Sequence, residues 1–210
     1  MALPLVVLVS GEGTNLQAIL DTVHGEAAEV VGVAASRADA RGLQRAAEAG
    51  VEGAVFAAAD YPDRTARDEA LGDWIESHGA ELVVLGGWME ILSPEFVRRF
   101  SGSILNVHPS LLPAFPGVRA IEQAVEHGVR VTGVTVHFVD EGVDTGPIVL
   151  QEALELAYDP RVSDVEAAVH AVEHRLLPRA IRLIAAGTVA VDPDDPRRVR
   201  VSENADVRHG

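Results

Sequence analysis

The first half of the chain alternates apolar strands with helices, and this alternation limits the possible fold more than any other feature of the sequence. The apolar run Leu3 to Val9 passes through a glycine turn, residues 10–15, into the helical spacing of Leu16, Ile19, Leu20 and Val23. The same pattern predicts strands at 30–35, 53–57 and 81–85 and helices at 40–49 and 63–78. Strands separated by helices form parallel sheets with right-handed crossovers. We therefore predict an α/β fold with an open, mostly parallel, twisted sheet and helices on both faces.

The second half continues the alternation and ends in a small appendage. Its predicted elements are strands at 104–108, 130–139 and 148–154, helices at 118–127 and 164–186, and a terminal hairpin of 189–191 with 199–201. We expect the last helix to kink at Pro178 and the polar end, 202–210, to fray. These boundaries predict one main domain, residues 1–187, followed by a C-terminal hairpin and polar tail, residues 188–210.

Composition limits the chemistry available to the chain. Of 210 residues, 48% are hydrophobic but only 4% are aromatic, so aliphatic side chains must fill the interior, as they do around buried parallel strands. The sequence contains no cysteine, which excludes disulfides, thiolate metal sites and thioester intermediates. Any catalysis must therefore use oxygen and nitrogen groups.

Charge and hydropathy indicate the class of partner. The formal net charge is −15 and no run of Lys and Arg compensates for it, so we expect no nucleic acid partner and no anionic membrane partner. A secretory signal pattern is absent, and no apolar segment reaches the roughly 18 to 20 residues of a membrane span. We therefore expect a cytoplasmic protein that binds small molecules, as a monomer or a homodimer.

The segment Ile104 to Gly117 is a candidate wall of a functional site. Asn106 and His108 are two positions apart, so a strand places both side chains on one face. Pro109 is predicted to end the strand at the imidazole, and two further prolines stiffen the exit. The alternative is that both polar side chains are satisfied by nearby backbone groups and do no chemistry.

The glycine turn before the first helix is a candidate anion site. Gly13 allows a tight turn, and the amides around Thr14 and Asn15 face outward at the positive end of the helix. Leu16 stands where a dinucleotide fingerprint needs its third glycine, and the P-loop Gly-Lys-Ser/Thr is absent. A single terminal phosphate is therefore the better ligand, although such a turn also serves simple helix initiation.

Two other loops follow strands at the edge where open α/β sheets bind ligands. The loop Gly86 to Pro94 carries bulky apolar groups suited to a flat aromatic ligand, but Trp88, Ile91 and Leu92 would equally cap the core, and we favour that alternative. The acidic loop Asp140 to Pro147 contains two glycines and a proline, which indicates a shaped loop; its alternative is a solvated hairpin.

One motif matches a metal-binding pattern, but the rest of the sequence does not support a metal site. His170-Ala-Val-Glu-His174 matches the H-x-x-E-H pattern of some zinc proteases, with both histidines on one helix face. No third acidic ligand is evident on a matching helix downstream. We therefore predict no metal site.

Three segments, taken together, resemble one family. They are Ser10-Gly-Glu-Gly-Thr-Asn-Leu-Gln17, Leu105-Asn-Val-His-Pro-Ser-Leu-Leu-Pro113 and Val136-His-Phe-Val-Asp-Glu-Gly-Val-Asp-Thr-Gly-Pro147. Their order and spacing resemble the folate-dependent phosphoribosylglycinamide formyltransferases, also called glycinamide ribonucleotide transformylases, from near residue 3 to near residue 185. The likeness implies a Rossmann-like formyltransferase fold.

The resemblance also implies a reaction and a set of residues. The reaction is transfer of formyl from 10-formyltetrahydrofolate, as co-substrate, to the amine of glycinamide ribonucleotide in purine biosynthesis, without a metal. The implied catalytic residues are Asn106, His108 and Asp144. The implied substrate-binding residues are Gly13, Thr14 and Asn15 for the phosphate and Glu173 for the ribose. The implied folate-binding residues are Arg64, Met89, Glu90, Ile91, Leu92, Asn106, Val139, Asp140, Glu141, Gly142 and Val143.

The chemistry agrees with that assignment. Attack of an amine on a formyl carbon turns the carbonyl oxygen into an oxyanion, and one donor aimed at such an oxygen lowers the barrier by about 2.7 to 4 kcal/mol. The Asn106 amide and a protonated His108 are such donors. Asp144 would favour the imidazolium and, through water, receive the proton that the amine loses.

The sequence departs from the family pattern at three positions. Arg119 stands where the family commonly has His, and Glu90 where it has a basic residue, so Glu90 would repel the anionic folate tail. Thr135 replaces a frequent Ser and keeps the hydroxyl.

Two rival functions follow from the same residues. A formyltetrahydrofolate deformylase would use water in place of the amine, but that relative usually carries an amino-terminal regulatory domain, and here the first strand begins at Leu3. A non-catalytic nucleotide- or folate-binding protein is the rival from another class. The joint presence of Asn106, His108 and Asp144 speaks against it.

Overall fold

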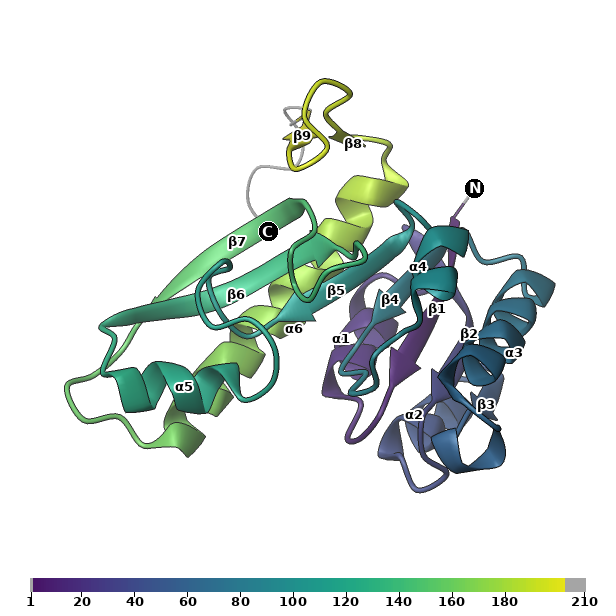
Figure 1. Ribbon diagram of the computed structural model, residues 1–210, viewed down its shortest axis with the longest axis horizontal. Helices are drawn as coiled ribbons and strands as arrows, with labels where there is room; N and C mark the ends of the chain where they lie inside the picture. The colour runs from purple at the N-terminus through teal and green to yellow at the C-terminus, as the bar shows by residue number, and fades with distance from the viewer. Residues whose placement is uncertain (1, 203–210) are drawn as a thin grey trace.

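The computed structural model describes residues 2–202 as one seven-stranded sheet covered by helices, with a small separate hairpin (Figure 1). The strands of the main sheet are β1 Leu3–Val9, β2 Ala28–Ala35, β3 Gly53–Val55, β4 Leu82–Leu85, β5 Ile104–His108, β6 Val131–Phe138 and β7 Ile148–Glu155. The α-helices are α1 Thr14–Thr22, α2 Arg41–Glu48, α3 Arg64–Ser77, α4 Pro94–Arg99, α5 Ala120–His127 and α6 Val162–Ala185. A single 3₁₀ turn, η1, spans Ala58–Asp60.

The strand order is β3-β2-β1-β4-β5-β6-β7. The pairs among β1 to β5 are parallel, whereas β5–β6 and β6–β7 are antiparallel. The predicted open, mostly parallel sheet is therefore confirmed. The order reverses at β1, which lies between β2 and β4, and ligands bind such folds at the carboxyl edge beside that reversal.

Alternation along the central strand divides the core into two layers. Leu5, Val7 and Val9 of β1 pack into the larger cluster with α1 and α6, while Val6 and Leu8 face the smaller cluster with α3 and α4. Successive strand side chains point to opposite faces, so a strand buried on both sides reads as one apolar run. That is why Leu3–Val9 shows no polar alternation.

Several predicted boundaries were wrong by a few residues, each for a local reason. The helix expected from 118 begins at Ala120, because Arg119 has φ 60 and lies in the left-handed region. The strand expected at 53–57 ends at Val55, and β2 begins at Ala28 instead of residue 30. The last helix runs through Pro178 from Val162.

Two helix starts near the site are well capped. The Asp63 carboxylate accepts from the Ala66 amide at 2.9 Å, and the Ser93 hydroxyl accepts from the Phe96 amide at 3.2 Å. Pro94 occupies the first turn of α4, where its missing N–H costs nothing. The Ser93 cap sets the direction of the chain where it leaves the 86–93 loop.

The predicted terminal hairpin is confirmed as β8 Val189–Val191 paired antiparallel with β9 Val199–Val201. It follows the end of α6 as a sheet of its own (Figure 1), and its Val189 and Val199 pack against the larger core cluster. Of the expected polar tail, residues 203–210 lie outside the described residues. Within residues 2–202, the helices are all too short or too polar to cross a membrane.

Candidate active site

His108 and Asp144 meet at the carboxyl edge of the sheet, although 36 positions separate them in the sequence. His108 ends β5, and Asp144 lies in the loop between β6 and β7. The imidazole Nδ1 is 3.4 Å from Asp144 Oδ2, and Nε2 is 2.8 Å from the Phe115 carbonyl oxygen. Both ring nitrogens of His108 thus face oxygen acceptors, an arrangement that an imidazolium, with two N–H donors, can satisfy.

Asp144 is held in place by its backbone and by three neighbours. Its φ of 53 is unusual for a residue with a side chain, and the Gly117 amide donates to Oδ2 at 2.7 Å. Burial by itself raises the pKa of this carboxyl, but His137, the Gly117 amide and His108 outweigh it, so the pKa of Asp144 lies below its ordinary value. The group is therefore a carboxylate at neutral pH.

The alternative for the acidic loop, a solvated hairpin, describes only its connectivity. The loop does join the antiparallel strands β6 and β7. The loop nevertheless turns the Asp144 carboxylate inward. Its close packing requires glycine at 146, because a Cβ there would overlap the Phe138 carbonyl. The Asp140 carboxylate accepts from Gly142 N–H at 3.0 Å and from the Thr145 hydroxyl at 2.6 Å, which closes the loop on itself.

His137 joins the site and was given no role by the sequence analysis. In the antiparallel register it stands opposite Asn106, whose Nδ2 is 3.2 Å from His137 Nε2. His137 Nδ1 lies 2.9 Å from the Phe138 carbonyl, which can only accept, so Nδ1 carries a proton. The other ring nitrogen, Nε2, also lies 3.7 Å from Asp144 Oδ1, so a proton on it would favour the carboxylate and lower its pKa. Only the register of β5 against β6 would have revealed this neighbour.

The glycine turn and the predicted ribose residue are also brought together. Asn15 Nδ2 donates to Glu173 Oε2 at 3.0 Å, and both side chains are buried. Gly13 has φ 68, and a Cβ there would lie 2.7 Å from Gly42 Cα, so the turn requires glycine. Burial raises the pKa of Glu173, against opposing effects of Asn15 and His170.

The loop after β4 sits beside that turn at the switch point of the sheet. Ser10 N–H donates to the Gly87 carbonyl at 3.0 Å, and the Met89 amide donates to the Ser10 hydroxyl at 2.8 Å. Met89 is 77% exposed and Ile91 68%, whereas Trp88 is buried. The expectation that these residues cap the core is therefore wrong for Ile91 and right for Trp88. An apolar surface is left open at the place where a ligand would lie.

The remaining residues that the resemblance implied for folate differ in exposure. Leu92 and Val139 are partly buried against the smaller core cluster, whereas Val143 is exposed. Glu141 pairs with Arg98 at 3.5 Å. Arg64 is exposed at the first position of α3.

Two of the three departures from the family pattern, Glu90 and Arg119, have charged partners of opposite sign. Glu90 Oε2 lies 3.2 Å from Nη1 of Arg67, a buried guanidinium that also pairs with Asp68. Arg119 is exposed and lies 3.5 Å from both Glu122 and Glu126. Both side chains are thus engaged locally in the structure.

The H-x-x-E-H motif forms no metal cluster. The rings of His170 and His174 are stacked 6.2 Å apart, and Glu173 between them turns to Asn15. Within the part of the chain that the structure describes, His, Cys, Asp and Glu side chains form no group of three that could hold a metal ion.

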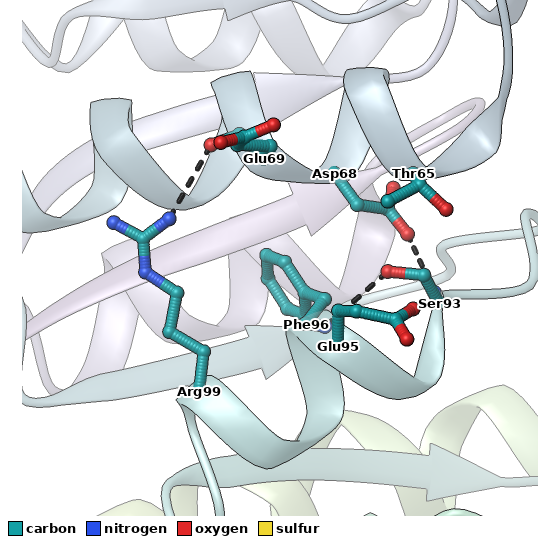
Figure 2. Close-up of a pocket in the computed structure, with 7 residues that line it drawn as sticks. All are labelled: Thr65, Asp68, Glu69, Ser93, Glu95, Phe96 and Arg99. Carbon is teal, nitrogen blue, oxygen red and sulfur yellow. Dashed lines mark hydrogen bonds between the residues drawn. The ribbon is translucent and has the colours of Figure 1, made fainter.

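A separate cavity of about 260 Å³ opens between α3 and α4 (Figure 2). Several of its polar groups are engaged: Ser93 N–H donates to the Asp68 carboxylate, and Arg99 pairs with Asp73 and Glu76. Phe96 forms an apolar wall. The cavity is lined by hydroxyls and carboxylates but by no imidazole, so we place the active site at the sheet edge and not here.

Comparison with known proteins shows the family of the chain. A family model described as formyl transferase matches residues 3–181. The phosphoribosylglycinamide formyltransferase of Haemophilus influenzae is 41% identical over 185 residues, which cover 87% of this chain and 87% of that protein. The trifunctional purine biosynthetic protein adenosine-3 of Chironomus tentans is 42% identical over 190 residues, 89% of this chain but 14% of that protein. The chain thus spans a small part of the trifunctional relatives.

Solved structures give the same result. The crystal structure of glycinamide ribonucleotide transformylase 1 from Symbiobacterium toebii has a TM-score of 0.90 and 46% identity, covering 96% of this chain and 95% of that one. A phosphoribosylglycinamide formyltransferase from Coxiella burnetii, in complex with CHES, has a TM-score of 0.89 and 36% identity, with 96% and 94% covered.

Proposed function

The chain belongs to the formyl transferase family, and from this premise we propose that it transfers a formyl group from 10-formyltetrahydrofolate to the amine of glycinamide ribonucleotide in purine biosynthesis. Relatives named phosphoribosylglycinamide formyltransferase or glycinamide ribonucleotide transformylase match 87% and 96% of the chain, not one motif. The single observation that carries the proposal is the meeting of His108 with Asp144, 3.4 Å apart, beside the half-buried Asn106.

Each of these side chains has a role that its surroundings support. As the substrate nitrogen bonds to the formyl carbon, the Asn106 amide and His108 would donate to the developing oxyanion. The Asp144 carboxylate, ionised because its pKa is lowered, would take the amine proton through a water molecule. The bond between the formyl carbon and the folate nitrogen then breaks, and that nitrogen takes up a proton, returned through the same water, so that tetrahydrofolate leaves as the neutral amine.

The proposed substrate end is the turn of Gly13, Thr14 and Asn15 together with Glu173. The amides at the start of α1 provide donors for a phosphate at the positive helix end. Glu173, fixed by Asn15, offers a carboxyl oxygen to the hydroxyls of a ribose. Asn15 and Glu173 are far apart in the sequence but touch in the fold. Their contact therefore supports one ligand shared by the glycine turn and Glu173.

The proposed folate site is the open apolar surface between the 86–92 and 139–143 loops. Exposed Met89, Ile91 and Val143 would cover a flat ring, and backbone groups of residues 140–142 would recognise its polar edge. The folate supplies the formyl group. Arg64 would attract the anionic tail, while Glu90 would weaken that attraction.

Incubation of the purified chain with both substrates tests the proposal, with the product read by mass spectrometry. We expect formylated glycinamide ribonucleotide. Formate released without the nucleotide would instead favour a deformylase, and binding without turnover would favour a non-catalytic protein. A deformylase would not need a binding site for the nucleotide, so the Asn15–Glu173 contact favours the transferase.

We also propose that residues 1–187 carry the whole activity and that the hairpin from residue 188 is an appendage. The hairpin forms its own two-stranded sheet and contributes no residue to the site. A chain ending at 187 should keep its turnover number. Sedimentation would decide between monomer and homodimer.

A further inference from the structure

We propose that Gln151 is a positioning residue that holds the 109–119 loop against the catalytic pair. This inference rests on the proposed function and goes beyond it, since Gln151 lies on the edge strand β7 and is largely exposed. It touches none of the proposed catalytic side chains. Its effect would pass through the backbone of the loop.

The loop supplies one backbone group to each member of the pair. The Phe115 carbonyl accepts from His108 Nε2 at 2.8 Å, and the Gly117 amide donates to Asp144 Oδ2 at 2.7 Å. The orientation of the imidazole and of the carboxylate therefore depends on where this loop lies. A displacement of about 1 Å at such a site can cost about 100-fold in rate.

A hydroxyl on β6 fastens the start of the loop. Thr135 is fully buried, and its Oγ1 donates to the Ser110 carbonyl at 2.7 Å while it accepts from the Leu112 amide at 3.1 Å. The Ser110 hydroxyl in turn donates to the Ala114 carbonyl, one residue before Phe115. These hydrogen bonds thus connect Thr135 to the part of the loop that carries the Phe115 carbonyl, which orients His108.

Gln151 completes this fastening. Its Nε2 donates to the Leu112 carbonyl and to Thr135 Oγ1, both at 2.9 Å. A hydroxyl has one proton and two lone pairs, so Thr135 then has all of its hydrogen-bonding capacity in use, and both hydrogens of the Gln151 amide are used as well. The β6–β7 register pairs Thr135 directly with Gln151, which places the amide there without strain.

Exposure of Gln151 predicts what its loss would do. Its removal creates no cavity, so the sheet should persist. The Leu112 carbonyl and the Thr135 lone pair would lose a fixed donor, and the loop would gain freedom. The turn at Gly13 and Glu173 lies on other elements, so substrate affinity should be unaffected.

The experiment compares Gln151→Leu and Gln151→Glu with wild type in the formyl transfer assay. Both replacements keep much of the side-chain size and remove the two donors, and the Glu variant keeps a polar group at an exposed position should the Leu variant fold poorly. We expect kcat to fall about 10- to 100-fold with KM for glycinamide ribonucleotide within about twofold of wild type. Gln44→Leu, which removes one exposed contact to Glu48 on α2, is the matched control and should not change kcat.

A double-mutant cycle separates positioning from general stability. If Gln151 acts through the loop on His108, Gln151→Leu should cost little further activity in a His108→Ala background. An equal loss in both backgrounds, an unchanged kcat, or a rise of KM with kcat constant would overturn the inference. A wild-type chain without formyl transfer would instead overturn the proposed function, so the two failures are distinguishable.

Discussion

Asn15 donates its side-chain amide to Glu173 Oε2 at 3.0 Å, which joins the first turn of α1 to the middle of α6 across 158 positions of sequence. Glu173 is buried, and the Oδ1 of Asn15 has no partner among the described residues. A buried acceptor without a donor is costly in a stable core but useful where a ligand supplies the donor. The contact therefore marks the proposed ribose position.

Replacement of Glu173 by Gln should change how stability depends on pH. Burial raises the folded pKa of Glu173 above its ordinary 4.5, so the folded state holds this proton more tightly than the unfolded state. Its contribution to the free energy of unfolding is then fully present below pH 4.5 and is lost as pH rises through the raised pKa. The variant should lack that loss. Urea unfolding of both proteins at several pH values from 4.5 upward measures it, and parallel curves would contradict it.

Replacement of His137 by Ala should raise the pKa of Asp144. Burial raises the pKa of Asp144. Of the effects that lower it, the hydrogen bond with His137 is the largest, followed by the Gly117 amide and the His108 charge. Carbon-13 NMR of the labelled carboxyl should show a titration midpoint below 3.8 in wild type and a higher one in the variant. A midpoint that does not move would show that His137 has no such effect.

The stability that Asp144 contributes depends on pH in the opposite direction to that of Glu173. Because its folded pKa is lowered, the stability that it contributes is present above pH 3.8 and is lost as pH falls through the folded pKa. Protonation of Asp144 should therefore not limit turnover near neutral pH. Acid unfolding of Asp144→Asn should lack this component.

Replacement of His108 by Ala should lower kcat about 10²- to 10⁴-fold, the usual weight of one acid–base group. The imidazole is buried between the Phe115 carbonyl and the Asp144 carboxylate, so its removal leaves both acceptors without this partner and should also lower the melting temperature. Steady-state kinetics and calorimetry on the same preparation measure both quantities. Turnover near that of wild type would refute the catalytic assignment.

Replacement of Glu90 by Gln should lower KM for the folate. Removal of one negative charge near an anionic tail is worth about 1 kcal/mol in water, or roughly fivefold, and salt should reduce the gain. Glu48→Gln, on the remote helix α2, makes the same change in net charge and serves as the control. Equal effects of the two variants would show that only the overall charge matters.

Much of the fold could be read from local pattern. The run Leu3–Val9, the long helix near Glu173 and the terminal hairpin were predicted within a few residues, because side-chain periodicity reports which faces are buried. Boundaries failed where one residue adopted an unexpected backbone conformation. Arg119, with φ 60, ended the helical pattern that its neighbours suggested.

The candidate site was predicted only in part, and the missing part is tertiary. Strand spacing placed Asn106 and His108 on one face, local sequence indicated the glycine turn, and the family resemblance supplied Asp144. It could not reveal His137 or Gln151, since their roles depend on which residues two antiparallel strands set side by side. A shift of one residue in that register would turn each side chain to the other face.

The amino-acid sequence by itself determined the kinds of element, the absence of thiol chemistry and the residues able to carry acid–base work. Only the tertiary structure decided that the Phe115 carbonyl and the Gly117 amide orient His108 and Asp144, and that Asn15 reaches Glu173. Periodicity is a property of neighbours along the chain. These contacts arise instead from strand order and register, which many distant residues set together.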